Sequence, residues 1–343
     1  MSLIFTLIFL IINTFLFIAH FSTSINTPVT DLIASIPNLF FAISYLIFIF
    51  IVNLFKLDTI YKIFIKTTSS ILFLIYLIVY IFPPINTLVL NNPANSYTNI
   101  TICSQNTKKA SAIFQDEFWQ LIKLQKCDII LLQEVINSTE LIQTITERLK
   151  TTTKDSYFIT NYGEFIVASK YPLKLTYSAT SQGFVTTDIQ LPQLEIFIIN
   201  THIWTPLEPK TPEHDPTLTH EIKPFIIRKE QTLELLSFLR QNYSTTPILI
   251  IGDFNMLPTH PFLAKLKRTH FSRITSQKHI TPTFSTSIPI IEIDHLFTNR
   301  PDIIAKRETY LHNTSDHGMQ VIYLHYQKPA GERARTSTGF NSH

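Results

Sequence analysis

Residues 247–257 read PILIIGDFNML, and this stretch decides the fold. The apolar run at 248–251 predicts a short strand that is buried on both faces. Directly after it come Gly252, Asp253 and Asn255. A buried strand needs no carboxylate or amide at its tip, whereas a catalytic site needs polar side chains that a rigid sheet holds in place. The stretch therefore predicts a buried sheet with a functional site at its strand ends.

Polar residues stand next to the ends of other apolar runs in the same way. They are Asn106, Gln133 and Glu134, Asn200 to His202, Asp294 and His295, and Ser315 to His317. Each has an ordinary structural explanation when taken alone. Glu134 suits a solvated strand end, Asp253 an Asx-type turn, His202 a hydrogen-bonded core position, and Ser315 a cap or turn. Only the whole set, in one chain, points to a single site.

Short β-like runs and amphipathic helices fill the rest of the chain. We expect strands at 99–103, 128–135, 157–160, 165–169, 174–179, 184–191, 194–204, 248–251, 291–298 and 318–326, and helices at 116–126, 138–150, 226–240 and 260–268. This pattern favours an α+β fold, a four-layer α/β/β/α sandwich of two packed sheets preceded by transmembrane helices. One domain accounts for residues 98–327, after a polar linker at 91–97 and before a disordered tail at 328–343.

The N-terminal part is almost free of charge. Up to residue 55 the only charged side chain is that of Asp31. Residues 1–90 therefore predict a membrane anchor of about three transmembrane helices, at 3–21, 39–55 and 68–90, since a span needs about 20 mainly apolar residues. Pro83 and Pro84 interrupt the third span. No Lys or Arg precedes the first span and its apolar core is long, so we expect an uncleaved anchor rather than a signal peptide.

The lysines predict the orientation of this anchor. Lys56, Lys62 and Lys66 stand between the second and third spans, where they favour a cytoplasmic loop. Three spans then deliver everything after residue 90 to the outer face of the cytoplasmic membrane, periplasmic or extracellular. If the third span does not cross, the domain faces the cytoplasm.

Cysteines and net charge narrow the function classes. If Asn106 and Glu134 lie level on neighbouring strands, Cys103 lies three residues back and Cys127 seven. The two cysteines are then offset by about 13 Å along the strands, too far for a disulfide, which needs Cα atoms within about 7 Å. We therefore expect free buried thiols. No cysteine and histidine have a spacing typical of zinc ligands.

The net charge of the domain is small. Of the 28 Lys and Arg residues, 25 follow residue 97, and of the 25 Asp and Glu residues, 23 do. A nearly neutral domain lacks the charge of a tight, nonspecific nucleic-acid binder.

Five segments, in chain order, carry a family resemblance. They are LLQEV (131–135), NTHIWTP (200–206), IIGDFN (250–255), EIDHLF (292–297) and SDHGMQVI (315–322). In this order they resemble the endonuclease/exonuclease/phosphatase superfamily, the deoxyribonuclease-I-like fold. The resemblance covers essentially all of 98–327 and, with the anchor, is to a membrane-anchored member of bacterial type.

The resemblance implies a hydrolase of phosphoric esters that uses Mg²⁺, with Mn²⁺ as a substitute. Glu134 is the first candidate for a metal ligand, and the resemblance adds Asn106 and Asp316. Carboxylates and amide oxygens suit such an ion, which supplies positive charge to a phosphorus surrounded by anionic oxygens.

The resemblance also assigns roles in proton transfer and phosphate binding. His317 titrates near neutrality and is oriented by Asp294. His202 contacts phosphate or assists the leaving group, and Asn255 donates to a phosphate oxygen. Asp253 orients water or shuttles a proton. Whether His317 or Asp253 is the general base stays open, as does the number of metal ions.

Two positions depart from the family pattern. Lys108 stands two residues after Asn106, where the exonuclease-III-like branch often has an acidic metal-site residue, and this disfavours the abasic-site repair subtype. Glu292 adds negative charge near the expected phosphate pocket, where a basic or neutral residue is common.

Two classes of function remain. The first is a membrane-anchored Mg²⁺-dependent phosphodiesterase that acts on a nucleic-acid or phospholipid-type phosphodiester, with the bilayer as its second partner. The alternative is a noncatalytic, membrane-tethered binding or scaffolding protein with the same fold. A transporter is disfavoured because the predicted spans contain no intramembrane charge that would mark a pathway. The sequence reveals neither a protein partner nor an oligomeric state.

Overall fold

The computed structural model describes residues 98–135, 139–192, 194–205, 219–242, 246–275, 283–284 and 291–326. It also describes a strand at 87–89 and the helical residues 59, 63, 66–71 and 74. The first two predicted spans, the linker at 91–97 and the tail at 328–343 lie outside the described residues.

The described chain forms two mixed sheets. Sheet A has the strand order β1 (Thr87–Val89), β10 (Ser272–Thr275), β11 (Asp294–Thr298), β9 (Ile248–Asp253), β8 (Leu194–His202), β7 (Phe184–Leu191) and β6 (Leu173–Ser178). Sheet B has the order β12 (Ile304–Tyr310), β13 (Met319–Tyr326), β2 (Thr98–Asn106), β3 (Ile129–Gln133), β5 (Phe165–Ser169) and β4 (Phe158–Tyr162). The pairs β1–β10, β8–β9 and β2–β3 are parallel, and the other neighbouring pairs are antiparallel.

The two sheets pack face to face through one apolar layer. Ile102 and Leu131 of sheet B lie in the same buried cluster as Ile198, Leu249 and Ile251 of sheet A. Side chains on a strand alternate between its two faces, so the neighbouring residues of β9 point to the outer face of sheet A. Burial of one such apolar side chain contributes about 1.5–3 kcal/mol to stability. Strand β9 buries side chains on both faces, so packing on each face holds it in position.

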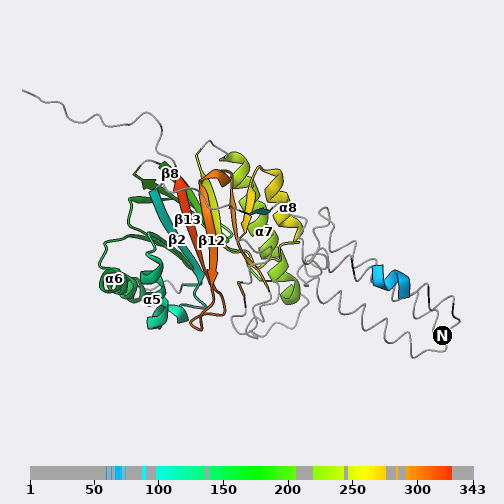
Figure 1. The fold of residues 1–343 in the computed structure, drawn as a ribbon, viewed down its shortest axis with the longest axis horizontal. Helices are drawn as coiled ribbons and strands as arrows, with labels where there is room; N and C mark the ends of the chain where they lie inside the picture. Colours follow the sequence, from blue (N-terminus) through cyan, green and yellow to red (C-terminus); the bar gives the residue numbers. More distant parts are fainter. Residues whose placement is uncertain are drawn as a thin grey trace, which may run out of the picture.

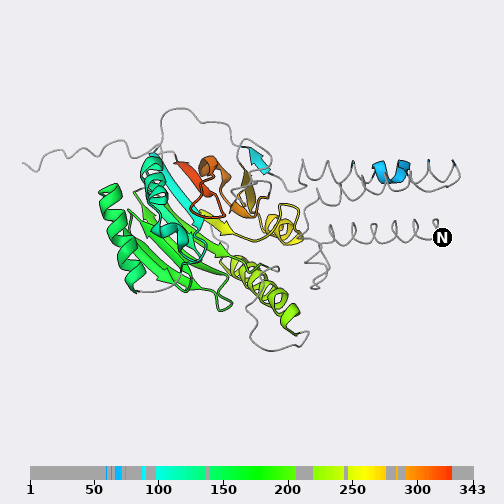
Figure 2. The same ribbon diagram turned by 90° about the horizontal axis from the view of Figure 1, so that it is seen from below.

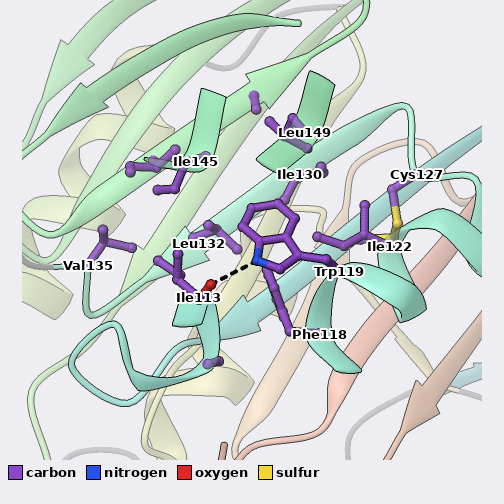
Figure 3. Close-up of a cluster of buried hydrophobic side chains, with 14 of the residues drawn as sticks. Ile113, Phe118, Trp119, Ile122, Cys127, Ile130, Leu132, Val135, Ile145 and Leu149 are labelled. Carbon is purple, nitrogen blue, oxygen red and sulfur yellow. Dashed lines mark hydrogen bonds between the residues drawn. A yellow bond between two sulfur atoms is a disulfide. The ribbon is translucent and has the colours of Figure 1, made fainter. Parts of the chain in front are cut away.

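Helices cover both outer faces (Figures 1 and 2). Helices α5 (Asp116–Gln125) and α6 (Thr139–Thr153) lie over sheet B, and α7 (Thr219–Gln241) and α8 (Pro261–Arg268) lie over sheet A. Figure 3 shows the layer over sheet B, where Trp119 packs among aliphatic residues and its indole N–H donates to the Ile113 carbonyl at 2.8 Å. Two packed mixed sheets with helices outside confirm the predicted α+β architecture.

Individual elements agree with the predictions to different degrees. The strands at 165–169 and 184–191 have the predicted bounds. Strands β10 and β12 were not predicted, because their sequences SRIT and IAKRETY contain arginines and few apolar residues. Helix α7 begins at Thr219, seven residues before its predicted start, and contains Pro224.

The C-terminal end of the third predicted span is wrong. Residues 87–89 form β1, which pairs in parallel with β10, so a membrane helix cannot extend to residue 90. Among the residues that the structure describes, no helix combines the length and apolar character that crossing a bilayer requires.

The prediction of free thiols is also wrong. Cys103 and Cys127 form a disulfide, with 5.8 Å between their Cα atoms and almost no exposure of either residue. The bond connects β2 to the turn that leads into β3, and it lies in the cluster shown in Figure 3.

The error came from treating Cys127 as part of an extended strand. Asn106 pairs with Gln133, one residue earlier than assumed. Cys127 lies before β3, after Lys126, whose φ of 53° ends α5 in a left-handed turn. The Cys127 N–H donates to the Ile122 carbonyl, so the chain here curls beside β2 instead of running along it.

Removal of this disulfide should destabilise the domain without unfolding it. The bond closes a loop of 24 residues, for which chain entropy gives about 3 kcal/mol of stabilisation. We expect the Cys103→Ser/Cys127→Ser variant of the full chain to unfold at lower urea concentration than the oxidised wild type. A reducing agent should shift the wild type to the same midpoint and leave the variant unchanged. Equal midpoints for oxidised wild type and variant would contradict a structural disulfide.

Candidate active site

The strand ends bring the predicted residues to one edge of the sandwich. In sheet A, Asp253 pairs with His202 of β8 and Asp294 of β11, so three neighbouring strands place these side chains in a row. In sheet B, Asn106 ends β2 and Glu134 follows β3. The two sheets meet at this edge through a hydrogen bond from Asn106 to Asp253.

Asp253 is the residue that joins the two sheets at the site. Its carboxylate is buried, with a relative exposure of 1%. Oδ2 accepts from Asn106 Nδ2 at 3.1 Å and from Asn255 Nδ2 at 3.2 Å. The same oxygen lies 3.6 Å from His317 Nε2 and 3.9 Å from His202 Nε2. One carboxylate oxygen thus faces two imidazoles and two amides.

His317 and Asp294 form the predicted oriented pair. His317 Nδ1 lies 3.0 Å from Asp294 Oδ2, which leaves Nε2 directed toward Asp253. The Phe284 ring packs against the imidazole in a T-shaped arrangement, with 5.1 Å between ring centroids. Burial alone would lower the pKa of His317, but Asp294 and Asp253 raise it to about 10. The imidazole is therefore protonated at neutral pH in this arrangement.

His202 has a carboxylate partner that sequence reasoning missed. Its Nδ1 lies 2.8 Å from Glu164 Oε1, and its Nε2 lies 3.5 Å from Glu134 Oε1. Glu164 follows Gly163 in the tight turn between β4 and β5, where the glycine has a φ of 56°. Burial would lower the pKa of His202, but Glu164, Asp253 and Glu134 raise it to about 9. A glutamate in a hairpin turn carries no signal of function, so only the fold reveals this pair.

Gly252 explains how β9 delivers Asp253. A Cβ atom at this position would lie 2.1 Å from the Thr201 carbonyl oxygen, and the residue has a φ of 137°. Any larger residue would push β9 away from β8 and carry Asp253 with it. The close approach of two parallel strands therefore requires glycine at this position.

Of the three predicted metal ligands, Asn106 and Glu134 contact each other, whereas Asp316 contacts Lys108. Asn106 Nδ2 donates to Glu134 Oε1 at 2.9 Å as well as to Asp253. Asp316 instead contacts Lys108, with 3.4 Å between Asp316 Oδ2 and Lys108 Nζ, and accepts weakly from Ser315.

The donor set fits a divalent cation. Glu134 and Asp253 both accept from the Asn106 amide, and both carry the hard carboxylate oxygens that Mg²⁺ prefers. Among the described residues, Asp253, Asp294 and His317 form a second group whose ligand atoms lie within 4.8 Å of one another. A cation there would compete with the His317–Asp294 hydrogen bond, which favours the position beside Glu134.

Burial raises the pKa of Asp253 to about 6, a shift that the nearby charge of Asp294 reinforces and that of His317 opposes. Burial in low dielectric disfavours the ionised carboxylate, and nearby positive charge opposes that effect. An additional cation beside Asp253 would therefore favour its ionised form.

A buried hydrogen-bond network holds the sheets together below the site. Gln133 Nε2 donates to Asn200 Oδ1 at 2.6 Å and to Ser104 Oγ, and Asn200 Nδ2 donates to the Leu132 carbonyl. Gln133 and Asn200 are fully buried. They immediately precede Glu134 and Thr201–His202 in the chain, so the network fixes the distance between these two strand ends.

Glu292 lies in the buried core of the domain. Its carboxylate, fully buried, lies 2.6 Å from Arg273 Nη2 and 3.2 Å from Arg307 Nη1. Arg307 also donates to the Asp294 carbonyl at 2.8 Å. Burial would raise the pKa of Glu292, but Arg273, His295 and Arg307 together hold it well below its usual range. The expectation of an added negative charge from Glu292 was wrong, because two arginines balance that charge and the group supports Asp294.

The Glu292 cluster should make stability depend on pH in acid. Glu292→Gln should lower the free energy of unfolding near pH 7 by about 3–5 kcal/mol, since it leaves buried arginines unpaired. Because the folded-state pKa of Glu292 is depressed, its contribution is complete above the ordinary value of 4.5 and is lost as the pH falls below it.

Urea unfolding of the full chain from pH 7 to pH 3 measures this dependence. The gap between wild type and Glu292→Gln should narrow below about pH 4.5. Glu147→Gln, an exposed position on α6, is the control and should follow the wild type. A gap that is constant with pH would show that Glu292 does not carry the stabilising charge.

Solved structures similar to this chain include three that cover about two thirds of it. An AP endonuclease from Archaeoglobus fulgidus superposes with a TM-score of 0.50 at 12% identity, covering 65% of this chain and 98% of that one. A family protein from Leptotrichia buccalis C-1013-b gives 0.48 at 14% identity, with 66% and 100% covered. The endonuclease domain of TRAS1, a telomere-specific non-LTR retrotransposon, gives 0.47 at 15% identity, with 67% and 100% covered. At 12% identity the likeness to the AP endonuclease concerns the fold alone.

A family model identifies the chain more directly. No curated protein sequence matches it. The model of the Endonuclease/Exonuclease/phosphatase family matches residues 94–317, which include every predicted site residue and more than half of the chain. The chain therefore belongs to the endonuclease/exonuclease/phosphatase family.

Proposed function

We propose that the domain is a phosphoesterase that depends on a divalent cation, Mg²⁺ or Mn²⁺ in its place. The reaction proposed is hydrolysis of a phosphodiester of nucleic-acid or phospholipid type. One observation carries the proposal: the buried Asp253 carboxylate lies between two imidazoles, each with its own carboxylate partner, and shares an amide donor with Glu134.

The pKa shifts favour Asp253 as the general base. At pH 7 its carboxylate, with a pKa of about 6, is mostly ionised and can accept a proton from water. His317, with a pKa raised to about 10, holds its proton and can donate a hydrogen bond to a phosphate oxygen as negative charge develops there. Asp294 stabilises the imidazolium through Nδ1.

His202 is suited to the leaving group. Its raised pKa keeps Nε2 protonated at neutral pH, and Glu164 fixes the ring through Nδ1. A protonated imidazole next to Asp253 can deliver a proton to the departing oxygen. The contact with Glu164 therefore supports the role in assisting the leaving group that the family resemblance implies for His202.

The phosphate-binding role of Asn255 requires an exchange of hydrogen bonds. Its side-chain Nδ2 already donates to the Ile203 carbonyl at 2.9 Å and to Asp253. Binding to a phosphate oxygen therefore means giving up one of these contacts. The φ of 49° at Asn255 keeps the amide near the carboxylate of Asp253 in the meantime.

Glu134 and Asn106 would hold the cation, with Asp253 beside them and Asp316 as a further candidate ligand. When bound, the ion would supply positive charge to the phosphoryl oxygens and lower the pKa of water. For Asn106 to ligate through Oδ1, its amide must release the Lys108 N–H, which now donates to that oxygen at 2.9 Å.

We further propose that the chain is anchored in the cytoplasmic membrane with its domain on the outer side. The uncharged N-terminal segments and the lysines at 56, 62 and 66 support this topology. The Cys103–Cys127 disulfide adds support, because such bonds persist in oxidising compartments outside the cytoplasm. A reporter fused after residue 90 that is active only in the cytoplasm would exclude this topology.

Substitution of the central carboxylate or its imidazole should abolish most of the activity. We expect Asp253→Asn and His317→Ala in the full chain to slow hydrolysis by about 10²–10⁴-fold, the usual range for acid–base groups. A chelator should remove the activity of the wild type, and Mg²⁺ should restore it. The assay compares a generic phosphodiester, phosphomonoesters, DNA, RNA and phospholipids.

Asp302→Asn is the matched control, because Asp302 forms an exposed ion pair with Arg300. Its rate should equal that of the wild type. Activity that survives the chelator, or survives both Asp253→Asn and His317→Ala, would overturn the mechanism. Absence of hydrolysis for every substrate class would favour the binding or scaffolding protein instead.

A further inference from the structure

Three consecutive residues beside the site have a strained backbone. Lys108, Lys109 and Ala110 are all non-glycine residues with positive φ, of 50°, 54° and 66°. Residues with a Cβ rarely adopt this left-handed conformation, and they do so as single residues rather than in runs. Such strain persists only where surrounding contacts enforce it, and it gathers at functional sites.

The contacts that enforce this turn come from the candidate metal ligands themselves. The Lys108 N–H donates to Asn106 Oδ1 at 2.9 Å, and the Lys109 N–H donates to Glu134 Oε2 at 3.2 Å. The Ala110 N–H donates to the Glu134 carbonyl at 2.9 Å. Any cation that ligates Asn106 or Glu134 must therefore compete with the hydrogen bonds that hold the turn.

The turn directs a positive charge onto a third candidate ligand. Lys108 Nζ lies 3.4 Å from Asp316 Oδ2, and the two side chains have relative exposures of 57% and 35%. An ion pair of this exposure is weak, so a divalent cation can displace the ammonium group from Asp316. The released lysine stays near the site, because the Ala110 N–H still holds the turn through the Glu134 backbone carbonyl, at 2.9 Å.

We propose that Lys108 is an exchangeable cation: it neutralises Asp316 in the empty site and binds an anionic phosphate oxygen of the substrate when the metal ion occupies Asp316. The proposal rests on the proposed function and deepens it. Lys108 then opposes metal binding and assists phosphate binding. A lysine ammonium suits this exchange, since it is a compact charge on a flexible stem.

The test is the Lys108→Met variant of the full chain, which keeps the length and apolar stem of the side chain. Titration with Mg²⁺ alone, followed by calorimetry, should give a Kd about two- to fivefold lower than that of the wild type, as expected for loss of a weak competing ion pair. Titration with inorganic phosphate at saturating Mg²⁺ should give a Kd about tenfold higher, through loss of a charged hydrogen bond. A general structural defect would weaken both.

Two controls separate the proposal from simpler effects. Lys123→Met, at an exposed position on α5, removes one positive charge elsewhere and should leave both constants unchanged. Lys108→Arg restores the charge and should return both constants toward the wild type. Circular dichroism melting should show equal folding of all variants.

The outcomes distinguish the two proposals. If the wild type binds no Mg²⁺, the proposed function fails. If the wild type binds Mg²⁺ but Lys108→Met does not bind it more tightly, or binds phosphate as well as the wild type does, the exchange role of Lys108 is overturned while the proposed function stands.

Discussion

The site depends on the burial of one carboxylate at the junction of two sheets. Asp253 is almost inaccessible to water, and an isolated charge in such a position would be very costly. Two imidazoles and two amides surround it, and they come from β2, β8, the loop after β9 and the loop before β13. Because each of these groups must reach the same oxygen, the carboxylate constrains how the two sheets lie at this edge.

Two buried polar clusters hold that geometry from below. On one side, Gln133 of sheet B bonds Asn200 of sheet A. On the other, Arg307 of sheet B contacts the carbonyls of Ile274 and Asp294 and the carboxylate of Glu292. Apolar packing alone would allow the sheets to slide, whereas these hydrogen bonds have fixed directions. The rigid scaffold and the site are thus parts of one polar arrangement within an apolar core.

The structure brings together the residues that the sequence named, whereas some of their partners could not be named in advance. Asp253, Asp294 and His317 could be named because each adjoins an apolar run, and the resemblance placed them in one family pattern. Glu164 could not be named, because its role arises only when the β4–β5 turn reaches β8.

The same limit explains the two wrong predictions about charge and cysteines. Glu292 was misjudged because Arg273 and Arg307 lie on other strands, whose register cannot be read from one segment. The disulfide was missed because a helix end, not a strand, positions Cys127. Contacts within a segment follow from its pattern, but contacts between segments follow from the fold.

Charge balance links the geometry to the chemistry. Five carboxylates gather at this edge, those of Glu134, Glu164, Asp253, Asp294 and Asp316. The positive groups that contact them directly include His202, His317 and Lys108.

The location of a bound cation tests this arrangement most directly. Crystals of the protein soaked in Mn²⁺ should show an anomalous peak in contact with the Glu134 carboxylate and beside Asp253, with the His317–Asp294 hydrogen bond intact. A peak enclosed by Asp253, Asp294 and His317, or no peak at this edge, would contradict it.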